Sequence, residues 1–174
     1  MQYKLNIHSE AERVMNEHLE ASFPHEGCGF FFGKNGKTRE ITEAQVVHNS
    51  KDGDRHRRFE ISAVDYMKAE RYALANDLDL LGVFHSHPNH PALPSVHDLR
   101  QAVPFFSYII KSIYEGELCD TTSWRLNEET NEFEEESVEI ELIKNECVTN
   151  QWYYKRYGST DTVSAYKRCQ CYAP

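Results

Sequence analysis

The 174-residue sequence lacks the features of a membrane or secreted protein. No apolar run approaches the ~18 residues of a membrane-spanning helix, and the opening residues MQYKLNIHSEAERV contain no apolar stretch of the signal-peptide kind. Positive charge is also scarce, because 19 Lys and Arg stand against 28 Asp and Glu, for a formal net charge of -9. A chain of that sign is not expected to bind a phosphate backbone. We therefore expect a cytoplasmic protein whose partners include neither nucleic acid nor a membrane.

Glycine, proline and cysteine are sparse as well. The 8 Gly and 6 Pro exclude a collagenous or disordered chain. The five cysteines are odd in number and widely spaced, which favours free thiols over disulfides. Hydrophobic residues make up 40% of the chain and aromatics 12%, enough to fill a core. This composition and length fit one globular domain with a short appendage.

Two stretches near the C-terminus depart from the average composition. Between Glu128 and Glu141 there are eight Glu and no Lys or Arg, typical of a solvated face. Residues 145–174 hold six aromatics, four Lys and Arg, and two acids. We assign residues 1–144 to the domain and 145–174 to an aromatic, basic appendage. We expect the appendage to dock near Glu134 to Glu141, with ordering against a partner or by homodimerisation as the alternative.

Hydrophobic periodicity predicts an α/β domain, a curved and largely antiparallel mixed sheet flanked by two main helices. Capping patterns place the helices at 9–23 and 62–76, with a short third helix from about residue 95. The strand ending at residue 84 is apolar enough to be central, and the glutamate-rich strand is expected at an edge, with its glutamates in solvent. The strands are expected at 3–7, 30–32, 38–48, 59–61, 78–84, 106–114, 118–126 and 133–143.

The central strand leads directly into His85-Ser86-His87-Pro88. Side chains alternate along a strand, so His85 and His87 point to one side and Ser86 to the other. A loop then leads to a helix whose first turn holds Ser95 and Asp98, and this turn can bring Asp98 to the same point. Two His nitrogens and one carboxylate oxygen form a three-ligand zinc set that leaves a fourth position open, as in catalytic sites. Glu26 lies just before the 30–32 strand and is the candidate base.

These residues resemble the signature of the JAMM or MPN-type zinc metalloproteases, the family of metal-dependent deubiquitinating enzymes and their bacterial relatives. The family pattern is an upstream Glu, then His-Ser/Thr-His-Pro, six residues, Ser, two residues and Asp. It is met in full by Glu26, His85, Ser86, His87, Pro88, Ser95 and Asp98. The resemblance covers about residues 3 to 143 and does not include the appendage.

The resemblance implies an MPN/JAMM-like, cytidine-deaminase-like architecture and one Zn²⁺ per chain. His85, His87 and Asp98 would bind the metal, Glu26 would act as general base, and Ser95 would stabilise the tetrahedral intermediate. The implied reaction is hydrolysis of a peptide or isopeptide bond after the C-terminal Gly-Gly of a ubiquitin-like or sulfur-carrier protein. A non-catalytic MPN-type scaffold and a general small-peptide zinc hydrolase are the alternatives. The sequence leaves open which ubiquitin-like protein and which linkage are cut, and whether the pathway is sulfur-carrier processing or deconjugation.

Overall fold

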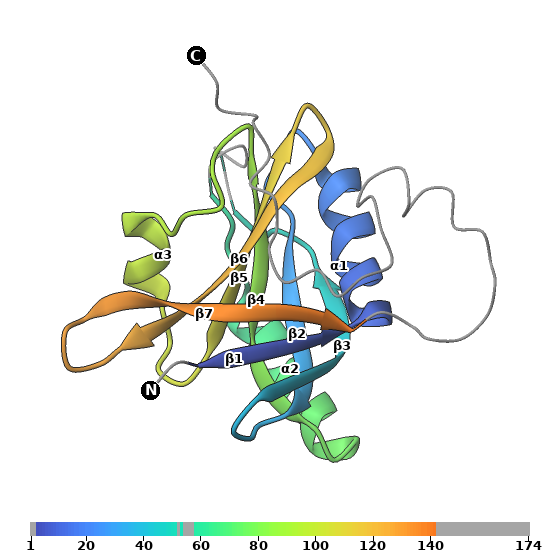
Figure 1. Cartoon of the computed structure of the whole chain (residues 1–174). Coiled ribbons are helices and arrows are strands. Elements are labelled where there is room, and N and C mark those ends of the chain that lie inside the picture. Colours follow the sequence, from blue (N-terminus) through green and yellow to red (C-terminus); the bar gives the residue numbers. More distant parts are fainter. Residues whose placement is uncertain (1–2, 52, 54–57, 142–174) are drawn as a thin grey trace.

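The computed structural model describes residues 3–51, 53 and 58–141. Seven strands and three helices are described within these residues (Figure 1). The strands are β1 (Lys4–His8), β2 (Cys28–Lys34), β3 (Arg39–Val47), β4 (Asp79–Pro88), β5 (Ser107–Tyr114), β6 (Glu117–Asn127) and β7 (Glu132–Glu141). The helices are α1 (Ser9–Ser22), α2 (Ala63–Ala75) and α3 (Val96–Gln101).

The strands form a closed barrel in the order β1-β3-β2-β4-β5-β6-β7, and β7 pairs with β1 to complete the circle. The prediction of a curved, largely antiparallel mixed sheet flanked by two main helices is therefore wrong. Three of the pairings, β1 with β3, β1 with β7 and β4 with β5, are parallel. Closure depends on pairing β1 with a strand about 130 residues away, Leu5 opposite Val138, and hydrophobic alternation reports a buried face rather than a paired edge.

Strand β7 is accordingly not an edge strand, and its glutamates are not all in solvent. Glu136 is only 3% exposed, and the Ser123 hydroxyl donates a hydrogen bond of 2.9 Å to its Oε2. The other five glutamates of β7 are exposed, as expected. The alternation in the sequence identified the strand correctly, but the barrel buries one of its acids.

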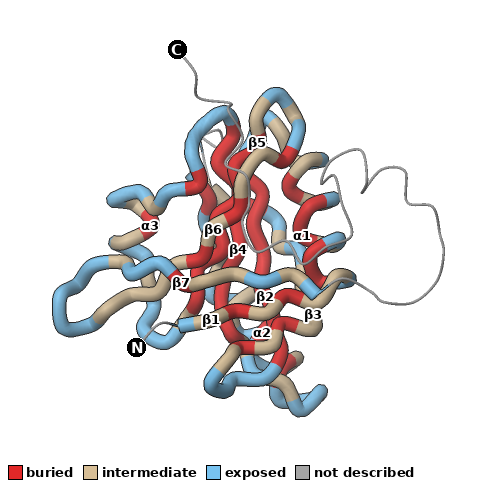
Figure 2. Tube along the Cα trace, in the orientation of Figure 1, coloured by how far each residue is buried: buried red, intermediate tan, exposed pale blue. Residues whose placement is uncertain are grey.

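Two apolar clusters cover the two faces of the β2–β4 pair. Helix α1 lies against all seven strands and contributes Met15 and Leu19 to the cluster that includes Phe31 and Phe84. Helix α2 covers the other face, where the second cluster includes Phe30 and Val83. Figure 2 shows the resulting buried centre along β2, β4 and β5. The strand that carries the two histidines is therefore fixed on both faces.

Most of the predicted elements are confirmed, with ends that differ by a few residues. Strands β2 and β3 pair in antiparallel fashion, and the Ser62 hydroxyl caps α2 by accepting from the Asp65 amide. The predicted strand at 59–61 is absent; the Asn49 side chain bonds the backbone at Arg58 and Glu60, and the Ser50 amide donates to the Glu60 carbonyl. Cys28 is a free thiol, as predicted. None of the described helices is long and apolar enough to cross a membrane. The appendage at 145–174, with its three cysteines, lies outside the described residues.

Candidate metal centre

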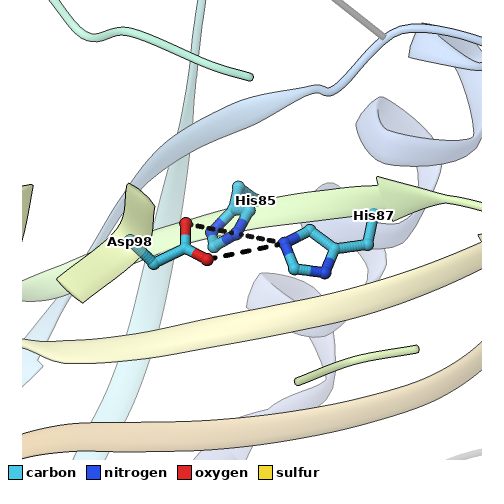
Figure 3. Close-up of side chains that lie close together, drawn as sticks. All are labelled: His85, His87 and Asp98. Atoms are coloured by element: carbon cyan, nitrogen blue, oxygen red, sulfur yellow. Dashed lines mark hydrogen bonds and ion pairs between the residues drawn. The ribbon is translucent and has the colours of Figure 1, made fainter. Parts of the chain in front are cut away.

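The two histidines lie at the end of β4, between β2 and β5. His85 pairs with Cys28 on one side and with Ile110 on the other. Because side chains alternate, His85 and His87 point to the same face, and their Nε2 atoms are 3.0 Å apart. Figure 3 shows both rings directed toward the Asp98 carboxylate. The convergence predicted from the spacing is present.

Asp98 is held in place by the first turn of α3. The Ser95 hydroxyl accepts from the Asp98 amide at 3.2 Å, and the Asp98 Oδ2 accepts from the Ser95 amide at 2.6 Å, which completes a capping box. The cap fixes the carboxylate with Oδ1 at 3.3 Å from His85 Nε2 and Oδ2 at 3.8 Å from His87 Nε2. The predicted cap is therefore what brings the third candidate ligand to the histidines.

The three donor atoms suit a tetrahedral metal. His85, His87 and Asp98 each offer one ligand atom, and these atoms all lie within 4.8 Å of one another. In a tetrahedral zinc site with bonds of ~2.0–2.1 Å, two ligand atoms are about 3.3 Å apart. The two Nε2 atoms are 3.0 Å apart, and each has one Asp98 oxygen near that distance, Oδ1 at 3.3 Å from His85 and Oδ2 at 3.8 Å from His87. His85, His87 and Asp98 thus fit a zinc ion.

The tautomer of His87 is fixed by its second nitrogen. Nδ1 lies 2.9 Å from the Pro91 carbonyl oxygen, which can only accept, so Nδ1 carries the proton and Nε2 presents its lone pair. Burial and the neighbouring His85 lower the pKa of His87 to about 4. The ring is therefore neutral at pH 7, which is the form that binds a metal.

His85 and Asp98 influence each other electrostatically. Burial alone would lower the pKa of His85, but the carboxylates of Asp98 and Glu26 outweigh burial and raise it. Burial alone would raise the pKa of Asp98, but His85 and the hydrogen bonds from Ser95 outweigh burial and hold it well below its ordinary range. Asp98 is thus an anion at neutral pH. The ring of Phe59 stacks on the ring of His85 with centroids 4.4 Å apart. Phe59 thereby helps to bury the His85 side chain, which is 0% exposed.

Glu26 reaches the site through the β2–β4 pairing. It lies two residues before Cys28, the first residue of β2, which is opposite His85. Glu26 is only 6% exposed, and its carboxylate raises the pKa of His85. The Glu26 carboxylate therefore lies close enough to the candidate ligands to interact with them electrostatically. It is not a member of the group of converging ligand atoms found in the described residues. An acid beside the ligands, but outside the ligand set, is where a base is expected.

A cavity of about 420 Å³ opens beside Asp98. Its wall is largely apolar and includes Phe59, Ile61, Tyr66, Val83 and Tyr108. The sequence analysis did not predict this wall, because its residues come from separate segments and form no local motif. The two additional histidines near the motif, His90 and His97, do not belong to the metal-binding group among the described residues.

The fold and the site define a class of protein, a barrel with a His-x-His strand end and an aspartate on a capped helix. A family model for prokaryotic homologues of the JAB domain matches residues 8–127. The chain belongs to this family of JAB/MPN domains.

Similar proteins are known by sequence and by structure. The chain is 32% identical over 75 residues to a Desampylase from Pyrococcus furiosus, an alignment that covers 43% of this chain and 50% of that protein. The chain thus spans about half the length of this curated relative. The solution structure of a Desulfitobacterium hafniense protein has a TM-score of 0.69 at 25% identity and covers 79% of this chain and 92% of its own. The solution structure of a Salinibacter ruber protein has a TM-score of 0.61 at 32% identity, and the match covers 81% of this chain and 94% of that protein.

Proposed function

We propose that the chain is a zinc-dependent hydrolase that cleaves a peptide or isopeptide bond after the C-terminal Gly-Gly of a ubiquitin-like or sulfur-carrier protein. The observation that carries this proposal is the convergence of His85, His87 and Asp98 beside an open cavity. The name of the Desampylase relative, which denotes removal of a ubiquitin-like modifier, supports the substrate class. The full set of three ligands favours an enzyme over a scaffold.

The chain's own residues divide the work of amide hydrolysis. A bound zinc ion would supply Lewis acidity and lower the pKa of water. His85, His87 and Asp98 would hold it, with the His87 ring fixed by the Pro91 carbonyl. Glu26 would accept a proton from the attacking water and pass it to the leaving amine. Its buried position suits that role, because a base shielded from bulk water keeps the proton for the substrate.

Ser95 would stabilise the oxyanion of the tetrahedral intermediate. Its oxygen accepts from the amides of His97 and Asp98, both at 3.2 Å. These two bonds use its lone pairs. Its O–H lies within reach of the Asp98 carboxylate, whose pKa it helps to lower, and would turn from that carboxylate to donate to an oxyanion. A donor of this kind contributes roughly 10²–10³ in kcat. Ser95 would therefore cap α3 and take part in the reaction at once.

The preference for Gly-Gly comes from the family resemblance, and the position of the cavity beside Asp98 supports it. A chain that crosses between the Phe59 wall and α3 must pass close to the ligands. Only residues without side chains allow the backbone such an approach. A Gly-Gly terminus meets this requirement, and a panel of short peptides without Gly-Gly distinguishes this specificity from that of a general peptide hydrolase.

The test uses the purified chain loaded with zinc and a ubiquitin-like protein joined through Gly-Gly to a fluorogenic amine. We expect turnover by the wild type, and a loss of about a thousandfold in Glu26→Gln with the zinc content unchanged. Loss of zinc in Glu26→Gln would make Glu26 a ligand instead of a base. A zinc-loaded wild type that cleaves no amide would identify the chain as a scaffold.

A further inference from the structure

Asn49 is a buried residue whose side chain makes four hydrogen bonds to separate points of the backbone. Its Nδ2 donates to the carbonyls of Glu26 (2.9 Å) and Arg58 (3.1 Å). Its Oδ1 accepts from the amides of Lys51 (3.0 Å) and Glu60 (3.1 Å). A side-chain amide has two donor hydrogens and two acceptor sites, so its bonding capacity is used fully. Carbonyls only accept and amides only donate, which fixes the orientation of this side chain.

The four contacts join two parts of the active site. Arg58 and Glu60 flank Phe59, whose ring covers His85 and lines the cavity. Asn49 bonds the backbone on both sides of Phe59, as a neighbouring strand would, and so fixes the wall of the cavity. The remaining Nδ2 bond goes to the carbonyl of Glu26, the proposed base. One side chain therefore connects the wall of the substrate groove to the base.

The strand of the ligands holds Glu26 from the other direction. The Gly27 amide donates to Ser86 Oγ at 3.0 Å, and the Ser86 amide donates to the Gly27 carbonyl at 3.1 Å. Ser86 lies between the two histidines and faces away from them. Gly27 has no room for a side chain, because a Cβ would lie 2.7 Å from Ser22 Oγ. With Ser86 on one side and Asn49 on the other, the Glu26 backbone is fixed to both the ligands and the groove.

We propose that Asn49 is a positioning residue that couples the substrate groove to the general base. The inference rests on the proposed function. Asn49 touches neither a candidate ligand nor the reacting atoms in the described structure, and it acts through Glu26 and Phe59. Its removal should change two kinetic constants together. A displaced Glu26 lowers kcat, and a loosened Phe59 wall raises KM.

The experiment compares Asn49→Ala with Ser50→Ala in the full zinc-loaded chain. Ser50→Ala is the matched control, because the Ser50 hydroxyl also bonds the wall, at the Glu60 carbonyl oxygen (2.8 Å), and does not bond Glu26. The probe is a peptide ending in Gly-Gly with a fluorogenic amide. For Asn49→Ala we expect kcat to fall about ten- to a hundredfold, as for a misplaced catalytic group, with KM raised and zinc unchanged. Ser50→Ala should remain within about twofold of wild type.

A second measurement needs neither metal nor substrate. Amide hydrogen exchange at Gly27 reports the Glu26 segment, and Asn49 makes no hydrogen bond to that amide. We expect faster exchange at Gly27 in zinc-free Asn49→Ala and no change in Ser50→Ala. If Asn49→Ala does not fold, Asn49→Asp takes its place, because it keeps the two acceptor contacts and loses the donation to Glu26.

The outcomes separate this inference from the proposed function. If Asn49→Ala and Ser50→Ala have equal kcat and equal exchange rates at the Gly27 amide, Asn49 does not couple the groove to Glu26. The proposed hydrolase function would be unaffected by that result. Loss of zinc in Asn49→Ala would also overturn the coupling, since Asn49 would then support the ligands and not the base. A wild type without hydrolase activity would contradict the proposed function, and exchange at Gly27 alone would then decide whether Asn49 holds the Glu26 segment.

Discussion

Two groups of buried ionisable side chains lie on opposite faces of the β4–β5 pair. On the inner face, Lys111 is completely buried and its Nζ lies 2.8 Å from Glu12 Oε1 and 3.1 Å from Thr121 Oγ1. On the outer face, His85, His87 and Asp98 direct three ligand atoms to one point. Helix α1 supplies the partner on the inner face, and helix α3 supplies it on the outer face.

The two groups differ in how their charge is balanced. The chain neutralises Glu12 with its own Lys111. Asp98 receives no ion pair from a Lys or Arg of the described residues, and its partners are two imidazoles, one of which has its pKa lowered to about 4. A buried anion beside two imidazoles, with no Lys or Arg of the described residues to neutralise it, suits a bound cation. A buried cluster that the chain neutralises itself is structural, whereas one that the chain leaves anionic is a candidate ligand site.

The largest expected effect on stability is at the inner pair. Glu12→Ala leaves Lys111 buried without its counter-charge, which typically costs ~3–5 kcal/mol. We predict that loss in the free energy of unfolding by denaturant titration, with normal zinc content in the folded fraction. The double variant Glu12→Gln with Lys111→Met should lose less, because it removes the buried charge as well. An unchanged stability in Glu12→Ala would show that the inner pair contributes little.

Ser95→Ala tests a residue with two roles on the outer face. Loss of the cap should lower stability by ~0.5–2 kcal/mol. Loss of the proposed oxyanion donor should lower kcat by roughly 10²–10³ with little change in KM. Stability and steady-state kinetics on the same preparation separate the two. Wild-type kcat in a destabilised Ser95→Ala would leave the cap as its only role.

The amount that the sequence reveals differs between the two faces. The outer site follows from local patterns, the alternation at residues 85–87 and the Ser-x-x-Asp cap, and both are present in the structure. The Lys111–Glu12 pair joins residues 99 apart and leaves no such pattern. Asn49 was equally hidden, since its partners are backbone groups. Barrel closure was not predicted either, because β1 and β7 are far apart in the sequence and pair only in the folded chain.

A smaller effect is expected from the appendage, which lies outside the described residues. Its aromatics and basic residues, together with the exposed glutamates of β7, lead us to predict that it docks on that strand. Truncation after Lys144 should then lower Tm by ~2–4 °C, the shift produced by about 1 kcal/mol in a domain of this size. Differential scanning calorimetry measures this. An unchanged Tm with weaker substrate affinity would instead make the appendage a recognition arm.

The central claim is that the outer cluster binds a metal through His85, His87 and Asp98, and elemental analysis of Asp98→Ala tests it most directly. The wild type should contain about one zinc per chain, and Asp98→Ala should lose it, because two imidazoles alone form an incomplete set. Circular dichroism on the same sample checks that the variant is folded. A folded Asp98→Ala that carries a full complement of zinc would contradict the assignment.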